Sequence, residues 1–281
     1  DRESTINRDP RSSQPGGICP NSAERDIVGT INGRQMGFAA YCDNGLLKIM
    51  SERKQLSIVK IGGNIVDNPG ALDAFLDDFH QLEGHKGLIH GGGVMASKMT
   101  KELGIETKMI NGRRVTDEET LKVVTMVYAG WINKNIVAQL QKRGCNAIGL
   151  SGADANVIPS VRRSPVPVDF GFVGDPDPNK TNADFVARLV DGGVTPVFCA
   201  ITHDEEGALL NTNADTIAYT VAAACSSLYQ TKLYYCFEKE GVLRDVNDPE
   251  SVIADMNRID YDGYKEQGAI ADGMITKLDN S

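Results

Sequence analysis

The sequence predicts an α/β protein, a three-layer αβα sandwich around a mainly parallel sheet. From residue 55 onward, short apolar runs rich in β-branched residues alternate with amphipathic helical patterns, beginning with the run 56–59 and the helical pattern 71–82. This strand–helix–strand rhythm indicates parallel strands joined by right-handed crossovers. A chain of 281 residues can form one large domain or two lobes with a substantial core.

The remaining elements follow from the same patterns. Further strands are expected at 87–89, 145–150, 195–201 and 232–237, and further helices at 94–103, 182–189, 215–224 and 261–268. Pro165 and Pro167 interrupt β-prone runs between 157 and 172, which is typical of hairpins that project from a sheet. A second Asn-Ala-Asp, at 182–184, is expected only to start a helix.

The longest predicted helix begins at the capping-box sequence 116–119 and runs to about Arg143, where Gly144 ends it. Its first half is apolar on nearly every side. One face can pack on the sheet, and the other needs a different cover. We therefore expect a homodimer through the helix 117–143.

Composition excludes several function classes. The net charge of −9 argues against a general binder of nucleic acid or of anionic membranes. The sequence contains no apolar run of about 18 residues and no signal-peptide core, so we expect a cytoplasmic protein without a membrane span. The six cysteines are widely spaced and form no C-x-x-C pair, which indicates reduced thiols and no metal site.

Residues 1–52 differ from the rest of the chain. They are polar in their first half and are interrupted by proline and glycine throughout. We expect a poorly structured N-terminal extension, either dispensable or serving as an added interaction segment.

Two glycine clusters follow predicted strands. K-I-G-G-N occupies 60–64 and H-G-G-G occupies 90–93, each between an apolar run and a helical pattern. Glycine lets backbone N–H groups approach an anion, and the carboxyl edge of a parallel sheet is where such sites collect. Either cluster alone is compatible with a simple strand–loop–helix corner, and His90 alone is better explained as a structural residue.

Three further motifs carry polar groups. N-G-R-R-V-T (111–116) supplies arginines, which grip carboxylates in a bidentate fork. N-T-N-A-D (211–215) lies at a strand–helix junction, where capping is the default role for one of its residues. G-M-I-T-K (273–277) offers a second lysine after a glycine, which alone would be taken for a solvated side chain.

In this order and with this spacing, the five motifs closely resemble those of the acetylglutamate kinase family, within the amino-acid kinase superfamily. The resemblance covers about Gln55 to Lys277. Aspartate and carbamate kinases share the glycine loops but do not combine N-G-x-R-V-T with G-M-I-x-K. The resemblance implies a carbamate-kinase-like fold, with an N-acylglutamate-binding lobe at 53–226 that contains the dimer helix and an ATP-binding lobe at 227–281.

The resemblance also implies a role for each motif. Lys60 and Lys277 would flank the γ-phosphoryl group of ATP, and Asp215 would hold both lysines. The expected substrate-binding residues are Gly92, Gly93, Arg114, Asn211 and Asn213. The expected ATP-binding residues are Gly62, Gly63, Glu238 and Gly241. Mg²⁺ would be carried by ATP, and no general base is needed because the attacking carboxylate is already anionic.

The implied function is ATP-dependent phosphorylation of the γ-carboxylate of N-acetyl-L-glutamate, or of another N-acylglutamate such as N-succinylglutamate, in arginine biosynthesis. The alternatives are a non-catalytic ligand-sensing member of the same fold and a kinase for another small carboxylate. Two departures from the family pattern stand out. Glu238 replaces the usual aspartate, and the sequence stops at Ser281, where family members continue, so we expect a truncated ATP lobe.

Overall fold

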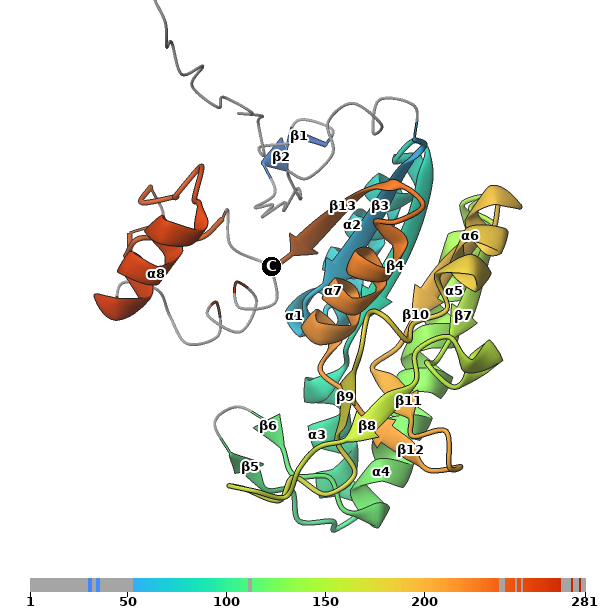
Figure 1. The fold of residues 1–281 in the computed structure, drawn as a ribbon, viewed down its shortest axis with the longest axis vertical. Helices are drawn as coiled ribbons and strands as arrows, with labels where there is room; N and C mark the ends of the chain where they lie inside the picture. The colour runs from blue at the N-terminus through green and yellow to red at the C-terminus, as the bar shows by residue number, and fades with distance from the viewer. Residues whose placement is uncertain are drawn as a thin grey trace, which may run out of the picture.

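The computed structural model describes residues 53–110, 113–237, 241–245, 247–248 and 250–268, the short strands β1 (Thr30–Ile31) and β2 (Arg34–Gln35), and the single positions 274 and 278. A five-stranded sheet lies at its centre in the order β13-β3-β4-β10-β7 (Figure 1). Its strands are β3 (Gln55–Ile61), β4 (His85–His90), β7 (Ala147–Leu150), β10 (Thr195–Phe198) and β13 (Gln230–Cys236). All neighbouring pairs are parallel, which confirms the predicted sheet.

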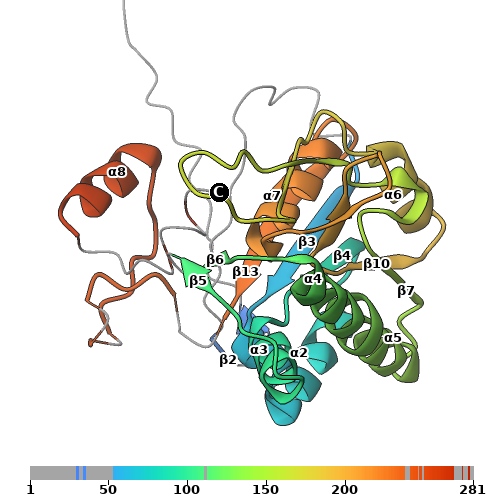
Figure 2. The same ribbon diagram turned by 90° about the horizontal axis from the view of Figure 1, so that it is seen from below.

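Helices cover both faces of the sheet. The first face carries α2 (Pro69–Gln81) and α5 (Asn133–Lys142), and the second carries α6 (Ala183–Asp191) and α7 (Ala214–Cys225) (Figure 2). The other helices are α1 (Gly63–Val66), α3 (Gly93–Glu102), α4 (Glu118–Thr125), the 3-10 turn η3 (Asp154–Asn156) and α8 (Arg258–Glu266). This arrangement confirms the three-layer sandwich. No helix in the described segments is long and apolar enough to cross a bilayer.

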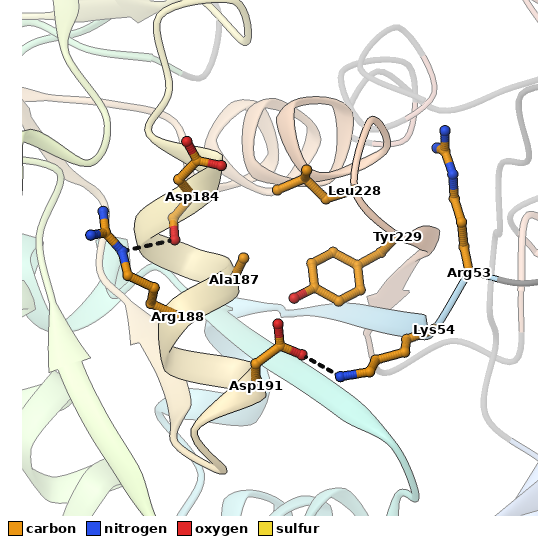
Figure 3. Close-up of a pocket in the computed structure, with 8 residues that line it drawn as sticks. All are labelled: Arg53, Lys54, Asp184, Ala187, Arg188, Asp191, Leu228 and Tyr229. Carbon is orange, nitrogen blue, oxygen red and sulfur yellow. Dashed lines mark hydrogen bonds and ion pairs between the residues drawn. The ribbon is translucent and has the colours of Figure 1, made fainter.

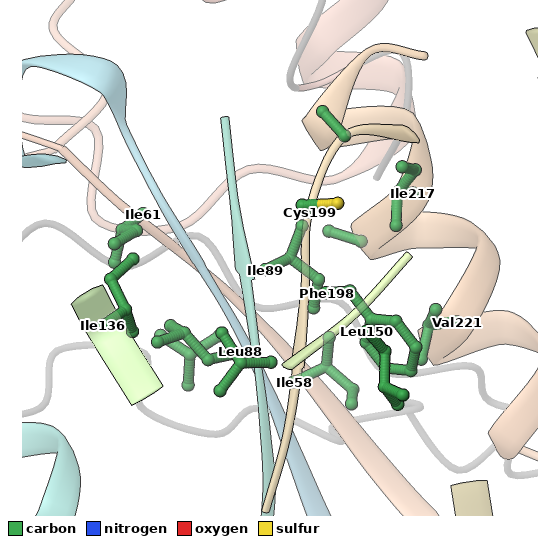
Figure 4. Packing of buried hydrophobic residues seen from close by; sticks show 14 of the residues in the cluster. Ile58, Ile61, Leu88, Ile89, Ile136, Leu150, Phe198, Cys199, Ile217 and Val221 are labelled. Atoms are coloured by element: carbon green, nitrogen blue, oxygen red, sulfur yellow. The ribbon is translucent and has the colours of Figure 1, made fainter. Parts of the chain in front are cut away.

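The core fills the space on both sides of the sheet (Figure 4). Ile61 and Leu88 point toward Ile136 of α5, whereas Ile58 lies on the other side, toward Val221 of α7. All five side chains are fully buried. Burial on both faces is typical of parallel strands, and it explains why these strands are continuous apolar runs rather than alternating ones.

Three antiparallel strand pairs lie beyond the carboxyl ends of the sheet strands (Figure 1). They are β5 (Met109–Ile110) with β6 (Arg113–Arg114), β8 (Ser160–Arg162) with β9 (Gly174–Pro176), and β11 (Ile201–His203) with β12 (Leu209–Asn211). The pair β8–β9 confirms the hairpin expected around the two prolines.

The predicted strand 195–201 is wrong in its extent. β10 ends at Phe198, and the chain continues through Cys199 and Ala200 into β11, which belongs to a different sheet. Because the four residues from Phe198 to Ile201 are all buried and none of the four is glycine or proline, the sequence carries no sign of the break.

The long predicted helix is present but differs in two details. Asp117, not Thr116, is its N-cap and accepts the Thr120 N–H at 2.8 Å. Thr116 is instead fully buried and bridges to Gly171. Between α4 and α5 the helix contains a π-helical segment, η2 (Met126–Ile132), which the periodicity did not predict. Such segments are wider than an α-helical turn and occur often at functional sites.

Other expectations are confirmed. Asn182 caps α6 by accepting the Phe185 N–H. Cys145, Cys199, Cys225 and Cys236 are free and buried, and burial raises the pKa of the last three thiols to about 12. Cys19 and Cys42 lie outside the described residues.

Candidate active site

A buried ion pair lies at the carboxyl edge of the sheet. Lys60 is the penultimate residue of β3, and its Nζ lies 2.6 Å from Oδ1 of Asp215 in the first turn of α7. Both side chains are more than nine-tenths buried. Because a buried charge without a partner is very costly, each group requires the other. The pairing holds the Lys60 ammonium group in a fixed position at the end of β3, an inner strand of the sheet.

The two predicted glycine turns flank this pair. Gly62 follows β3, donates its N–H to Cys236 O at 2.9 Å and precedes α1. Gly91 to Gly93 follow β4 and lead into α3. A Cβ built on Gly91 would lie 3.7 Å from Cβ of Ala214, so the second turn packs directly against the start of α7 beside Asp215. The structure therefore brings Lys60, Asp215 and both turns into one place.

Gly92 cannot be replaced without cost. Its φ of +153° is one that L-residues rarely adopt. A Cβ here would overlap Ile132 and lie 3.0 Å from Cδ1 of Tyr128, two residues of the π-helical segment η2. The neighbouring Gly93, by contrast, has open space around it. The first glycine lets the turn approach η2, and the second leaves room for a ligand.

Asp67 lies beside both turns. Its Oδ2 would be 3.8 Å from a Cβ on Gly63 and is buried without a hydrogen-bond partner among the described residues. Burial raises the pKa of this carboxyl group, and the backbone N–H of Met95, in the first turn of α3, opposes that rise. A carboxylate at a helix N-terminus is favourably placed against the helix dipole.

Arg114 approaches the start of α3 from β6. Its Nη2 donates to Gly93 O at 3.0 Å and to Ser97 Oγ at 2.7 Å. The residue is buried, and its Nη1 makes no well-formed hydrogen bond to any described residue. A buried guanidinium with one end anchored and one end unsatisfied is an arrangement that an anionic ligand could complete.

The two predicted asparagines behave differently. Asn211 ends β12, and its Nδ2 donates to Thr116 Oγ1 at 3.0 Å. Asn213 is the N-cap of α7, because its Oδ1 accepts the N–H groups of Asp215 and Thr216 at 2.7 and 3.2 Å. The capping role, which was the default interpretation of this motif, is therefore confirmed for Asn213. The cap uses only Oδ1, so the Nδ2 group of this side chain remains available for a ligand.

His90 is structural in this fold. Its Nδ1 donates to Gly91 O at 2.8 Å, and its Nε2 accepts from Nδ2 of Asn133 at 3.0 Å. The same Asn133 nitrogen also donates to Val197 O. This pairing requires a neutral ring. Complete burial, together with the nearby Lys134 charge, lowers the pKa of His90 to about 4, although the hydrogen bond to Gly91 opposes the shift.

Two predicted residues, Lys277 and Glu238, lie outside the described residues. Gly241 is described and lies in the segment before α8, where a Cβ would be 2.8 Å from Cγ1 of Val252. Within the described part of the chain, no three histidine, cysteine or acidic side chains form a group that could hold a metal ion.

Sequence reasoning missed Tyr128, Ser97 and Asp67, all of which contact the predicted site. Ser97 carries a weak sequence signal, because it stands four residues after Gly93 and so lies on the same face of α3. Tyr128 and Asp67 carry none, since their contacts cross between separate elements.

A cavity of about 900 Å³ lies at the opposite, amino edge of the sheet (Figure 3). Asp191 is its central polar group and pairs with Lys54 at 2.8 Å and with His85 at 3.2 Å. The Tyr229 phenol points toward Asp191 (Figure 3). These groups satisfy one another and join the start of β3 to the end of α6, which is a structural role.

The family of this chain follows from comparison with known proteins. A family model described as the amino acid kinase family matches residues 55–281. An acetylglutamate kinase from Bacteroides thetaiotaomicron is 55% identical over 229 residues, which cover 82% of this chain and 88% of the relative.

Solved structures agree on the fold. A Streptococcus mutans protein superposes with a TM-score of 0.64 at 22% identity, covering 80% of this chain and 88% of that one. A carbamate kinase from Giardia gives a TM-score of 0.54 at 12% identity, covering 82% of this chain and 87% of that one. The chain therefore belongs to the amino acid kinase family. Within that family it groups with the acetylglutamate kinases, as the five motifs indicated.

Proposed function

We propose that this chain transfers the γ-phosphoryl group of ATP to the γ-carboxylate of N-acetyl-L-glutamate or a closely related N-acylglutamate. The observation that carries the proposal is the buried Lys60–Asp215 pair, set between two glycine turns at the carboxyl edge of the sheet. The high identity to proteins named acetylglutamate kinase supports the choice of substrate.

In this proposal, Lys60 stabilises negative charge that develops on the transferring phosphoryl group. Such reactions depend mainly on positioning and electrostatic stabilisation, and a carboxylate nucleophile has no proton to lose. Asp215 keeps Lys60 in place. Lys277 would supply a second positive charge from the opposite side, and this role rests on the motif alone.

The substrate would be bound at the start of α3. The N–H groups of Gly92 and Gly93 would receive the γ-carboxylate, as a helix N-terminus favours an anion. The free Nη1 of Arg114 would pair with the α-carboxylate, and Asn211 and Asn213 would orient the N-acyl amide. Residues 53–226 would form this substrate lobe.

The nucleotide would be bound by the remaining motifs. Gly62 and Gly63 would contact the ATP phosphates, and Glu238 and Gly241 would belong to the nucleotide pocket of an ATP lobe at 227–281. Mg²⁺ would be carried on the ATP phosphates and neutralise their charge.

We also propose a homodimer through the helix that runs from α4 through η2 to α5. Met126 and Trp131 of η2 are 59% and 67% exposed, respectively, although both are large and apolar. Exposed apolar side chains on one helix are typical of an interaction surface.

A hydroxamate assay tests the activity. The protein is incubated with Mg-ATP and either N-acetyl- or N-succinylglutamate, and acyl phosphate is trapped with hydroxylamine. We expect product from one or both, and the comparison ranks the two acyl groups. Substrate binding without product from either would instead indicate a ligand-sensing protein, and faster turnover of unblocked glutamate or aspartate would indicate another carboxylate kinase.

Variants of the lysines test the mechanism. Lys60→Ala is expected to lower kcat roughly 10²- to 10³-fold, as loss of one transition-state donor does, with a smaller effect on KM. Lys277→Ala should likewise lower kcat more than it changes KM. Lys54→Ala is the matched control, because Lys54 precedes the same strand but lies in an exposed ion pair at the other edge. Equal activity of Lys60→Ala and Lys54→Ala would rule out the assigned role.

A further inference from the structure

Three hydrogen bonds join Ser97, Gly93 and Arg114 at the start of α3. The Nη2 group of Arg114 donates to Ser97 Oγ at 2.7 Å and to Gly93 O at 3.0 Å. The Ser97 hydroxyl in turn donates to Gly93 O at 2.9 Å. Ser97 stands four residues after Gly93, so the two acceptors lie on the same face of the helix. The three groups therefore form a closed ring of hydrogen bonds that ties β6 to α3.

The donors and acceptors of this ring are all assigned. A guanidinium can only donate, whereas a serine hydroxyl donates one hydrogen and accepts through its lone pairs. Because Ser97 gives its hydrogen to Gly93 O, its lone pairs are free to face Arg114 Nη2. Both hydrogens of Nη2 then have an acceptor. A guanidinium is planar, so holding Nη2 at two points also fixes the direction of the rest of the group.

The ring leaves the other end of Arg114 for a ligand. The residue is buried, and its Nη1 has no hydrogen-bond partner among the described residues. Gly93 and Ser97, by contrast, are exposed. The unsatisfied nitrogen thus belongs to a group that is bonded to an exposed helix turn, and an anionic ligand at that turn could pair with it.

The bond from Ser97 to Gly93 O would not by itself indicate a function, because serine often donates to a carbonyl one turn earlier in a helix. Ser227 is an example at the opposite edge of the sheet, where its exposed hydroxyl donates to Ala224 O at 3.1 Å. Ser97 differs, because the same oxygen also accepts from a guanidinium. Hydrogen bonds to charged groups are stronger than those between neutral groups.

We propose that Ser97 is a positioning residue that holds the Arg114 guanidinium in the orientation in which Nη1 pairs with the α-carboxylate of the N-acylglutamate. This inference deepens the proposed function and rests on it. The same helix turn would bind the γ-carboxylate through the N–H groups of Gly92 and Gly93, so Ser97 also fixes the arginine relative to that second carboxylate. Ser97 acts on substrate affinity rather than on phosphoryl transfer, because Arg114 is assigned to the substrate and not to the transferring group.

Ser97→Ala tests the proposal, because it removes only the hydroxyl from an exposed helix position. We expect KM for N-acetylglutamate to rise roughly fivefold, less than the full loss of a hydrogen bond to a charged group because water can replace an exposed hydroxyl in part. The kcat and the KM for ATP should stay within about twofold of the wild type. Ser97→Thr keeps the hydroxyl and should keep the wild-type KM. Ser227→Ala is the matched control and should change none of these values.

A double-mutant cycle with Arg114→Lys identifies the partner. Lysine keeps the charge but lacks the planar fork that Ser97 orients. If Ser97 acts through Arg114, Ser97→Ala should add little to the rise in KM that Arg114→Lys already causes. Additive effects would overturn the proposal.

Three other outcomes would also overturn it. They are an unchanged KM in a Ser97→Ala protein that melts at the wild-type temperature, a KM raised as much by Ser97→Thr as by Ser97→Ala, and a parallel rise in the KM values for both substrates, which would show a general structural role. Inactivity of the wild type toward every N-acylglutamate would refute the proposed function, and this inference with it, whereas the other outcomes concern Ser97 alone.

Discussion

Gly92 and Gly93 are adjacent in the proposed substrate turn, but their surroundings differ. Gly92 has a φ of +153°, and a Cβ on it would overlap Ile132. Gly93 begins α3 with ordinary helical geometry, and a Cβ on it would have no neighbour within 4 Å. Alanine substitutions at the two positions therefore distinguish the glycine that this turn needs in order to fold from the glycine that leaves space for the substrate.

Gly92→Ala should be strongly destabilising. A sparsely populated backbone conformation costs about 1–3 kcal/mol, and overpacking against Ile132 and Tyr128 adds about 1–3 kcal/mol. The sum of roughly 2–6 kcal/mol corresponds to a fall of roughly 5–20 °C in Tm for a domain of this size. Gly93→Ala should leave Tm within about 2 °C, since alanine is the better helix former.

Thermal unfolding followed by circular dichroism measures the Tm of each variant, and activity measured over a range of N-acetylglutamate concentrations gives the KM. Gly93→Ala should raise KM for N-acetylglutamate although it folds normally, because its methyl group occupies the space left for the ligand. Equal Tm values for the two variants would refute the reasoning about Gly92. An unchanged KM in Gly93→Ala would remove Gly93 from the substrate site.

Three further predictions concern single groups. Because the pKa of His90 falls from about 6.5 to about 4 on folding, its neutral ring contributes stability that is complete above pH 6.5 and is lost as pH falls through 4. Urea unfolding should show that the free energy of unfolding falls by about 2 kcal/mol between neutral pH and pH 5. His90→Gln should lack this pH dependence of stability. Asp215→Asn should lower the free energy of unfolding by about 3–5 kcal/mol, since it leaves Lys60 buried without a countercharge. The double variant Asp215→Asn/Lys60→Met should recover most of this lost stability. A loss below about 1 kcal/mol in Asp215→Asn would contradict the prediction. Trp131→Glu should convert the proposed dimer to a monomer in sedimentation velocity, and an unchanged mass would place the interface elsewhere.

Local signals explain most of what the sequence predicted. The glycine turns after β3 and β4 and the buried lysine between them depend on short segments in which strand, glycine and helix follow one another. The strands were recognisable because both faces of the sheet are covered, so each strand is a continuous apolar run.

The remaining features depend on contacts between distant segments. Nothing near Phe198 marks the end of β10, because the run continues through buried Cys199 and Ala200 into a different sheet. The π-helical turn lies where η2 meets the Gly92 turn, and Tyr128 and Ile132 reach Gly92 only in the folded chain. The choice of Asp117 over Thr116 as N-cap follows from the burial of Thr116 beside Gly171.

The position of β3 in the sheet has a consequence for synthesis of the protein. β3 is the first of the five strands to leave the ribosome, but its neighbours are β4, the second, and β13, the last. Roughly 170 residues separate Ile61 from Gln230. At a translation rate of about 5–20 residues per second, one edge of β3 therefore stays unpaired for about 10–30 s before β13 has been synthesised. An unpaired apolar edge is a template for association with other chains. The nascent chain should therefore depend on chaperone protection until translation passes β13, and cell-free synthesis stopped before residue 230 should yield aggregates that the longer chain avoids.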